Sequence, residues 1–363
     1  MRRKLSRRDV LRAGGISAAS VAVGGVLGRN VLAQNDHSHG SEHSGEHSTG
    51  VHGGLAGMVG RVDHKRNGFD PSEILYDFDT GDVSKSGDQS VRTYEVFAQD
   101  KEVEIAPGLF FPAWTYNGRI PGPTLRATEG DRLRIRFTNG GSHPHTIHFH
   151  GLHPARMDGV PGVGRGDVMP GETFTYEFDA FPFGCHLYHC HSNPLRRHIH
   201  KGLYGAFIID PDPKRHPDQA DAAAKRSFAR AKDEGINEMV MVMNSFDTDF
   251  DGGNEVYAVN TVGFAYANEP IPVSRDETVR VYLVNITEFD PINSFHLHGN
   301  FFNYYDTGTS LEPTVFTDTI MQCQAQRGIL EFNFKGYEPG MHMFHAHQTE
   351  FVELGWMGMF DVR

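Results

Sequence analysis

The feature that most constrains this chain is an internal duplication built around paired histidines. The first half contains "PHTIHFHG" from Pro144 and "YHCHSNPLRRHIHKGLYG" from Tyr188. The second half contains "INSFHLHG" from Ile292 and "FHAHQTEFVELGWMG" from Phe344. Each half has one early and one late His-x-His motif, so the repeat predicts two domains of similar fold. The paired histidines are His148, His150, His189, His191, His296, His298, His345 and His347.

The segments around these motifs have the pattern of short β-strands. Apolar and polar residues alternate in "LRIRFTN", "TFTYEFD", "VRVYLVN" and "ILEFNF", and turn-forming residues bound these segments. Many short strands at this spacing predict an all-β chain of sandwich or barrel domains. The charged, alanine-rich stretch from Asp218 to Gly235 is expected to be helical and to connect the two domains.

Strand geometry predicts two kinds of metal site. Residues two apart in a strand point to the same side, so each His-x-His aims two imidazoles at one target. Eight converging imidazoles exceed what one zinc ion needs. Cys190 and His145 have the opposite parity and share the other face, where His198 can swing back toward the thiolate. Two imidazoles and a thiolate with a weak or absent axial partner are the ligands of blue copper.

Length and charge restrict the class of protein. The 363 residues suffice for two domains, each with its own core. The net charge of -12 argues against nucleic acid or an anionic membrane surface as a partner. We place domain 1 at residues 69–212, a linker at 213–237 and domain 2 at 238–363.

The N-terminal region is predicted to be an export signal followed by a tail. Residues 1–33 contain the twin arginines Arg7 and Arg8, a short glycine-rich apolar stretch and a cleavage site ending at Ala33. A cleaved twin-arginine signal is favoured over an uncleaved anchor, which predicts a periplasmic or extracellular protein without a membrane span in its mature form. Residues 34–68 form a histidine-rich tail expected to be disordered, either scavenging metal or merely solvated.

The motifs His-x-x-His-x-His-Gly and His-Cys-His resemble those of multicopper oxidases, and the duplicated chain resembles their two-domain, laccase-like branch. The resemblance implies two cupredoxin-like Greek-key domains and about four coppers per chain. It implies a type 1 copper at His145, Cys190 and His198, and a type 2 copper at His148 and His296. The type 3 pair would be held by His150, His189, His191, His298, His345 and His347.

The second half departs from this pattern at the type 1 positions only. Asn293, Ala346 and Phe351 stand where the first half has His145, Cys190 and His198. Domain 2 is therefore expected to supply half of a trinuclear cluster without a type 1 copper. The resemblance further implies a homotrimer, with each cluster between subunits. Leu203, five residues after His198, is expected at the axial type 1 position without coordinating, and Trp356 takes its place in the repeat.

Reduction of dioxygen to water consumes protons, so carboxylates are expected near the cluster. By resemblance Asp158 is the proton-relaying acid near the type 2 copper, and Glu350 is a weaker candidate. A turn-forming aspartate before Gly159 and a solvated glutamate are the alternative interpretations. Cys185 and Cys323 could form a disulfide in an oxidising compartment, which their spacing cannot establish.

The resulting hypothesis is an oxidase that takes single electrons from a reducing substrate at the type 1 copper and reduces dioxygen to water. Phenols, aromatic amines and metal ions all remain open as substrates. A Cu(I) or metal oxidase of copper tolerance is one alternative. A copper-containing nitrite reductase is another, although it carries an aspartate where this chain has His148 and lacks the His-Cys-His motif. An electron-transfer cupredoxin would not need eight further histidines, and a storage protein would not need a type 1 site.

Overall fold

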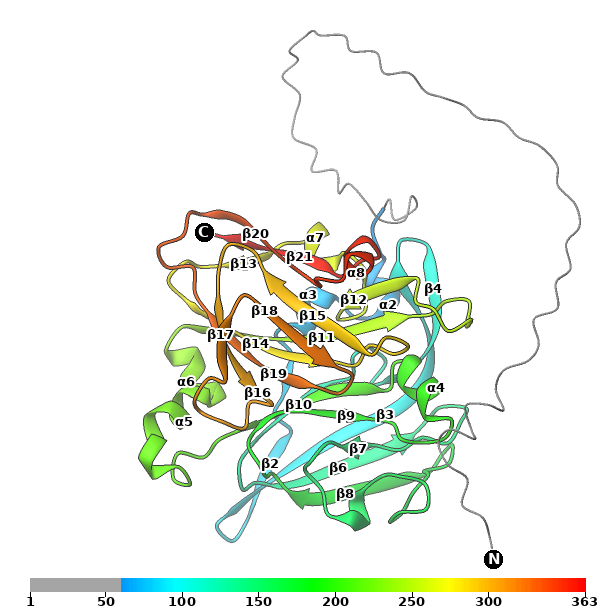
Figure 1. Cartoon of the computed structure of the whole chain (residues 1–363). Coiled ribbons are helices and arrows are strands. Elements are labelled where there is room, and N and C mark those ends of the chain that lie inside the picture. Colours follow the sequence, from blue (N-terminus) through cyan, green and yellow to red (C-terminus); the bar gives the residue numbers. More distant parts are fainter. Residues whose placement is uncertain (1–59) are drawn as a thin grey trace, which may run out of the picture. The chain divides into compact units, whose positions relative to one another are not determined.

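The computed structural model describes residues 60–363, which form most of one compact unit, and Figure 1 shows its strands and short helices. The predicted signal at 1–33 and the tail up to residue 59 lie outside the described residues. Within residues 60–363, no helix has the length and apolar character needed to cross a membrane.

Domain 1 consists of two sheets. One has the strand order β1 (Phe78–Asp79), β5 (Thr124–Thr128), β10 (Tyr204–Asp210), β9 (Gly184–His189) and β7 (His148–Phe149). The other has the order β2 (Asp82–Ser86), β3 (Gln89–Ala106), β6 (Arg132–Asn139) and β8 (Thr173–Asp179), with β4 (Leu109–Tyr116) paired to β3. The alternation predicted for "LRIRFTN" is confirmed in β6, where Leu133, Ile135 and Phe137 are buried. These side chains pack with Phe149 and Phe207 of the other sheet.

Domain 2 repeats this design with two further sheets. The first has the order β12 (Val256–Val259), β11 (Ile236–Phe246), β14 (Thr278–Asn285), β19 (Arg327–Phe332), β16 (Phe302–Asp306) and β17 (Val315–Thr317). The second has the order β13 (Ile271–Val273), β21 (Met357–Val362), β20 (Gly340–His345), β15 (Ile292–Leu297) and β18 (Thr319–Cys323). The described residues are mostly β-strand, and their four sheets form two domains, which confirms the predicted two-domain β fold.

The helices are short and lie at the connections. They are α2 (His64–Asn67), α3 (Pro71–Ile74), α4 (Leu195–His200), α5 (Ala220–Arg226), α6 (Phe228–Asp233), α7 (Ala265–Asn268) and α8 (Thr349–Glu353), with 3-10 turns η1 (Ala155–Met157) and η2 (Pro217–Gln219). The helices α5 and α6 confirm the helical connection expected before domain 2. In Figure 1 they lie beside the strands, between β10 and β11 along the chain.

The two domains share a buried apolar cluster and a buried charge network. The cluster includes Val103 and Ile208 of domain 1 and Val242 and Tyr282 of domain 2. Arg126 of β5 donates to Asp210 of β10 at 2.8 Å and to Glu238 of β11 at 3.0 Å. Its side chain is only 1% exposed. Because a buried cation needs its counter-charges, Arg126 couples the stability of the two domains.

Two expectations need correction. The tail predicted at 34–68 ends earlier, because Asp63 caps α2 and the Asn67 amide exchanges two hydrogen bonds of 2.9 Å with the backbone of Glu104. Residues 60–68 are therefore described as part of the fold. The disulfide considered for Cys185 and Cys323 is absent within residues 60–363, since both cysteines are free, one buried and the other exposed.

Candidate metal centres

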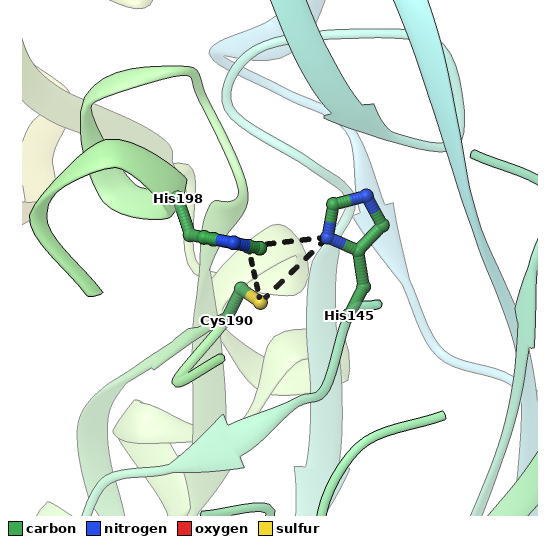
Figure 2. A group of neighbouring side chains, drawn as sticks. All are labelled: His145, Cys190 and His198. Atoms are coloured by element: carbon green, nitrogen blue, oxygen red, sulfur yellow. Dashed lines mark hydrogen bonds between the residues drawn. The ribbon is translucent and has the colours of Figure 1, made fainter. Parts of the chain in front are cut away.

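The first candidate centre consists of His145, Cys190 and His198, which three separate segments bring together. His145 precedes β7 and is held by two backbone hydrogen bonds to Val168, of 3.1 and 3.0 Å. Cys190 directly follows the end of β9, and His198 lies on α4. Figure 2 shows the two imidazole rings and the sulfur converging on one point.

Distances within this triad suit a single small ion. Cys190 Sγ lies 3.2 Å from His198 Nδ1 and 4.0 Å from His145 Nδ1, and the two nitrogens are 3.2 Å apart. All three residues are at most 2% exposed. Burial lowers the pKa of His145 to about 3 and that of His198 to about 4, so both imidazoles are neutral and free to donate a lone pair. Burial also raises the pKa of the Cys190 thiol.

Leu203 lies against this triad. Its backbone carbonyl accepts a hydrogen bond of 2.9 Å from Cys190, and its amide donates to His198 at 3.3 Å. Its side chain is fully buried in the same apolar cluster as Cys190. Leucine has no lone pair to offer, and the axial role of Leu203 stays a prediction.

The second candidate centre is the histidine group of domain 1 on the opposite face. His148 pairs with His189 in the register of β7 and β9, which places the two His-x-His motifs side by side. The ring centroid of His148 lies 5.4 Å from that of His189 and 5.3 Å from that of His191. His150 Nε2 lies 2.9 Å from His189 Nε2. Burial lowers the pKa of His150 to about 2 and that of His189 to about 4.

Domain 2 repeats this histidine group with the same register. His296 pairs with His345 between β15 and β20, and its ring centroid lies 5.3 Å from that of His345 and 5.4 Å from that of His347. His298 Nε2 lies 2.8 Å from His345 Nε2. Unlike the group in domain 1, this one is open, because His298 and His347 are exposed. No candidate metal group among residues 60–363 combines histidines from both domains.

Matching hydrogen bonds hold the two groups in the same way. The hydroxyl of Thr146 accepts from the backbone of His191 at 2.9 Å, and that of Ser294 accepts from His347 at 2.7 Å. Sequence reasoning missed both hydroxyls. Their signal was available, since each directly follows the position that is His145 in the first half and Asn293 in the second.

Of the two predicted acids, the structure brings Asp158 to the histidines. Its Oδ1 lies 2.8 Å from His148 Nδ1 and 3.4 Å from His153 Nε2. The sequence missed Asp318, the counterpart in domain 2, whose Oδ2 lies 3.8 Å from His296 Nδ1. Glu350 is exposed on α8, and its carboxylate makes no hydrogen bond or ion pair within residues 60–363, so its role stays a prediction.

In domain 2, packed side chains fill the place that the triad of His145, Cys190 and His198 has in domain 1. The Trp356 indole donates to Asn293 Oδ1 at 3.0 Å, and Asn293 donates to the hydroxyl of Thr287 at 2.8 Å. Ala346 and Phe351 belong to the same apolar cluster as Trp356. This packing agrees with the loss of all three ligands that the sequence indicates.

The donor sets fit copper. One thiolate with two neutral imidazoles suits a soft, redox-active ion, and groups of neutral imidazoles are typical ligands for copper. Imidazole rings whose nitrogens approach each other this closely cannot both be positively charged. The imidazoles must therefore be neutral, which is the form that binds a metal ion. What the geometry offers is therefore a buried sulfur-containing site joined, through Cys190 and its neighbours His189 and His191, to a histidine group on the other strand face.

Comparisons with known proteins give the family. Two family models, both described as multicopper oxidase, match residues 98–214 and 236–363. A crystal structure of a multicopper oxidase is 55% identical, with a TM-score of 0.76, and the match covers 84% of this chain and 100% of that chain.

Curated relatives are more distant or match over shorter segments. A copper-containing nitrite reductase of Neisseria meningitidis is 27% identical over 226 residues, covering 60% of this chain and 56% of the relative. Copper resistance protein A of Escherichia coli is 41% identical over 105 residues, covering 28% and 17%. The chain thus spans about half the length of the first of these relatives. From the two family matches, which together cover more than half of its residues, the chain belongs to the multicopper oxidase family.

Proposed function

We propose that this protein is a laccase-like oxidase that couples one-electron oxidation of a reducing substrate to reduction of dioxygen to water. The observation that carries this proposal is the contiguous His189-Cys190-His191 segment. Its thiol belongs to the buried triad, while its two imidazoles belong to the histidine group on the opposite face. The chain is therefore built to join a site that receives electrons to a site that uses them.

In this proposal His145, Cys190 and His198 hold a type 1 copper, and the eight paired histidines hold a trinuclear cluster. Copper bound there would supply the electron acceptor and the site of dioxygen reduction. The protein keeps the triad dry, because its three residues are at most 2% exposed. Asp158 holds the orientation of His148 and is placed to pass protons, since its carboxylate is a quarter exposed and reaches both His148 and solvent.

We further propose a homotrimer in which the histidine group of domain 1 meets that of domain 2 from another copy. Two observations support this arrangement. Each group alone is half of the expected ligand set, and the group of domain 2 has exposed imidazoles. A head-to-tail contact of this kind must close into a ring or polymerise, and a ring of three closes it. The predicted twin-arginine signal at residues 1–33 supports a periplasmic or extracellular location for this assembly.

Two variants test the assignment. Cys190→Ser should abolish the intense blue absorption and oxygen consumption, while a type 2 copper signal persists in electron paramagnetic resonance. Cys185→Ser is the matched control, because Cys185 is also fully buried but lies outside both sites, and it should stay blue. Replacing His345 with glutamine should stop oxygen consumption and spare the blue colour. A Cys190→Ser protein that remains blue would show that the type 1 assignment is wrong.

Nitrite reduction is a second candidate, because a curated relative is a copper-containing nitrite reductase. Two features count against this candidate. This chain has His148 where those enzymes are expected to carry an aspartate, and it has His191 as a further imidazole beside Cys190. Anaerobic assay with nitrite and a reduced donor separates the candidates. Nitrite turnover faster than oxygen turnover would favour the second candidate.

A further inference from the structure

A surface pocket of about 460 Å³ lies beside the triad of His145, Cys190 and His198. Six of the residues that line it are Asp100, Trp114, Ser142, His143, Arg197 and Lys201. The volume is within the range of sites for small organic molecules. None of the three triad residues lines the pocket itself.

Trp114 joins this pocket to the triad. Its ring centroid lies 4.5 Å from that of His143, which lines the pocket, and 5.2 and 4.8 Å from those of His145 and His198. Trp114 is only 5% exposed, and its backbone amide donates to the backbone carbonyl of Lys201 at 2.8 Å. A molecule in the pocket is therefore separated from both triad imidazoles by one aromatic layer.

The charges at the pocket favour an anion. The Arg197 guanidinium lies 5.3 Å and the Lys201 ammonium 5.4 Å from the Trp114 ring. Within residues 60–363, neither cation makes an ion pair with a carboxylate, and the Lys201 ammonium donates to the backbone carbonyl of Pro112 at the pocket. Of the acids lining the pocket, Glu102 is paired with Arg66 at 2.7 Å, which leaves Asp100 as the opposing charge. Burial, and next the nearby Arg197, lower the pKa of Lys201 to about 8, so its ammonium is still charged at neutral pH.

The same charges disfavour a metal cation as the donor. Three cations line the pocket, since Lys101 joins Arg197 and Lys201, and no group of three metal-ligating side chains within residues 60–363 belongs to its lining. An aromatic ring carrying a negative group would instead satisfy both features, since its ring can pack near the indole and its charge can pair with the cations.

We infer that the reducing substrate is a small aromatic anion that docks over Trp114 and is held by Arg197 and Lys201. The inference rests on the proposed oxidase function and specifies its substrate class. Each donor loses one electron and leaves as its one-electron-oxidised radical. Four such electrons, with four protons from solvent, convert one dioxygen to two waters.

Binding can be tested on the metal-free protein with redox-inert probes. The chain has two tryptophans, and Trp356 is buried in domain 2, so a fluorescence change that Trp114→Phe removes reports on the pocket. Benzenesulfonate should bind at least about fivefold more tightly than benzyltrimethylammonium at low salt, and added salt should reduce the difference. Equal affinity for the two probes would overturn the inference.

Arg197→Gln should weaken benzenesulfonate binding by about three- to tenfold, the value of one exposed charge contact. Arg196→Gln is the matched control: it is the neighbouring exposed arginine of α4, but its guanidinium packs on Phe289 at 5.1 Å. It should leave binding unchanged. Equal losses in the two variants would show that the effect is general surface charge and would overturn the assigned contact.

Steady-state oxidation with anionic and cationic aromatic donors of matched potential separates the two proposals. The inference predicts a lower KM for the anionic donor and a loss of that preference in Arg197→Gln. If the copper-loaded protein binds benzenesulfonate as predicted but oxidises no donor, the proposed oxidase function fails and the anion pocket stands. If it oxidises cations or metal ions as readily as anions, and Arg197→Gln changes neither KM, the oxidase stands and the substrate class is wrong.

Discussion

Asp158→Asn tests whether the carboxylate beside His148 takes part in dioxygen reduction. The substitution removes the charge and keeps the shape. His148 should keep its orientation, because its Nδ1 also lies 2.9 Å from the backbone carbonyl of Asp158. The variant therefore isolates the carboxylate from the fold around it.

The expected magnitude follows from the contacts. A hydrogen bond to a charged group contributes about 1.5–3 kcal/mol. Asp158 makes its 2.8 Å contact with His148 from a side chain that is 25% exposed, so solvent screening favours the lower end of that range. A loss of about 1.5 kcal/mol corresponds to roughly tenfold slower oxidation of the reduced enzyme by dioxygen.

The assay mixes fully reduced protein with dioxygen and follows the return of the blue band. Asp318→Asn is the matched control, because its carboxylate is 3.8 Å from His296 and 44% exposed, beyond hydrogen-bond distance. It should slow the same step by less than about threefold. Reduction of the blue band by the donor should not change in either variant. Unchanged reoxidation in Asp158→Asn, or a larger loss in Asp318→Asn, would refute the reasoning.

Three further perturbations have defined outcomes. Leu203→Met should lower the type 1 potential in a redox titration of the blue band, because a sulfur donor stabilises the oxidised ion; an unchanged potential would mean that Leu203 is not axial. Arg126→Met should lower the free energy of unfolding by about 3–5 kcal/mol in urea titration, because buried Asp210 loses its cation and buried Glu238 keeps only Arg280, and a loss under about 1 kcal/mol would contradict that view. Lys201 faces Arg197 and Asp100, and its pKa is about 8. Its ammonium is therefore charged below that pH and neutral above it. Benzenesulfonate binding should weaken by about three- to tenfold between roughly pH 7 and pH 9, because the anion loses one cationic partner. Lys201→Arg should abolish that pH dependence, and a persisting dependence would assign it to another group.

Much of the site could be predicted because its rules are local. The two-residue period of a strand is enough to place His189 and His191 on one face and Cys190 on the other. The duplication then indicates which positions lost their ligands, and the structure fills them with Trp356 and its neighbours.

What could not be predicted depends on contacts between distant segments. Trp114 comes from β4 and carries no motif, and it meets His198 only because β4 lies beside the chain after α4. Asp318 follows a different local sequence from Asp158, so the repeat did not reveal it. The pairing considered for Cys185 failed for the same reason, because spacing along the chain does not show that one thiol is buried and the other exposed.

The measurement that tests the central claim most directly is the copper-to-protein ratio of the fully loaded protein, determined by elemental analysis. One thiolate and ten imidazoles arranged as a triad and two half-clusters predict about four coppers per chain. A protein that takes up only zinc, or only two coppers per chain, would contradict the assignment of a type 1 site joined to a trinuclear cluster.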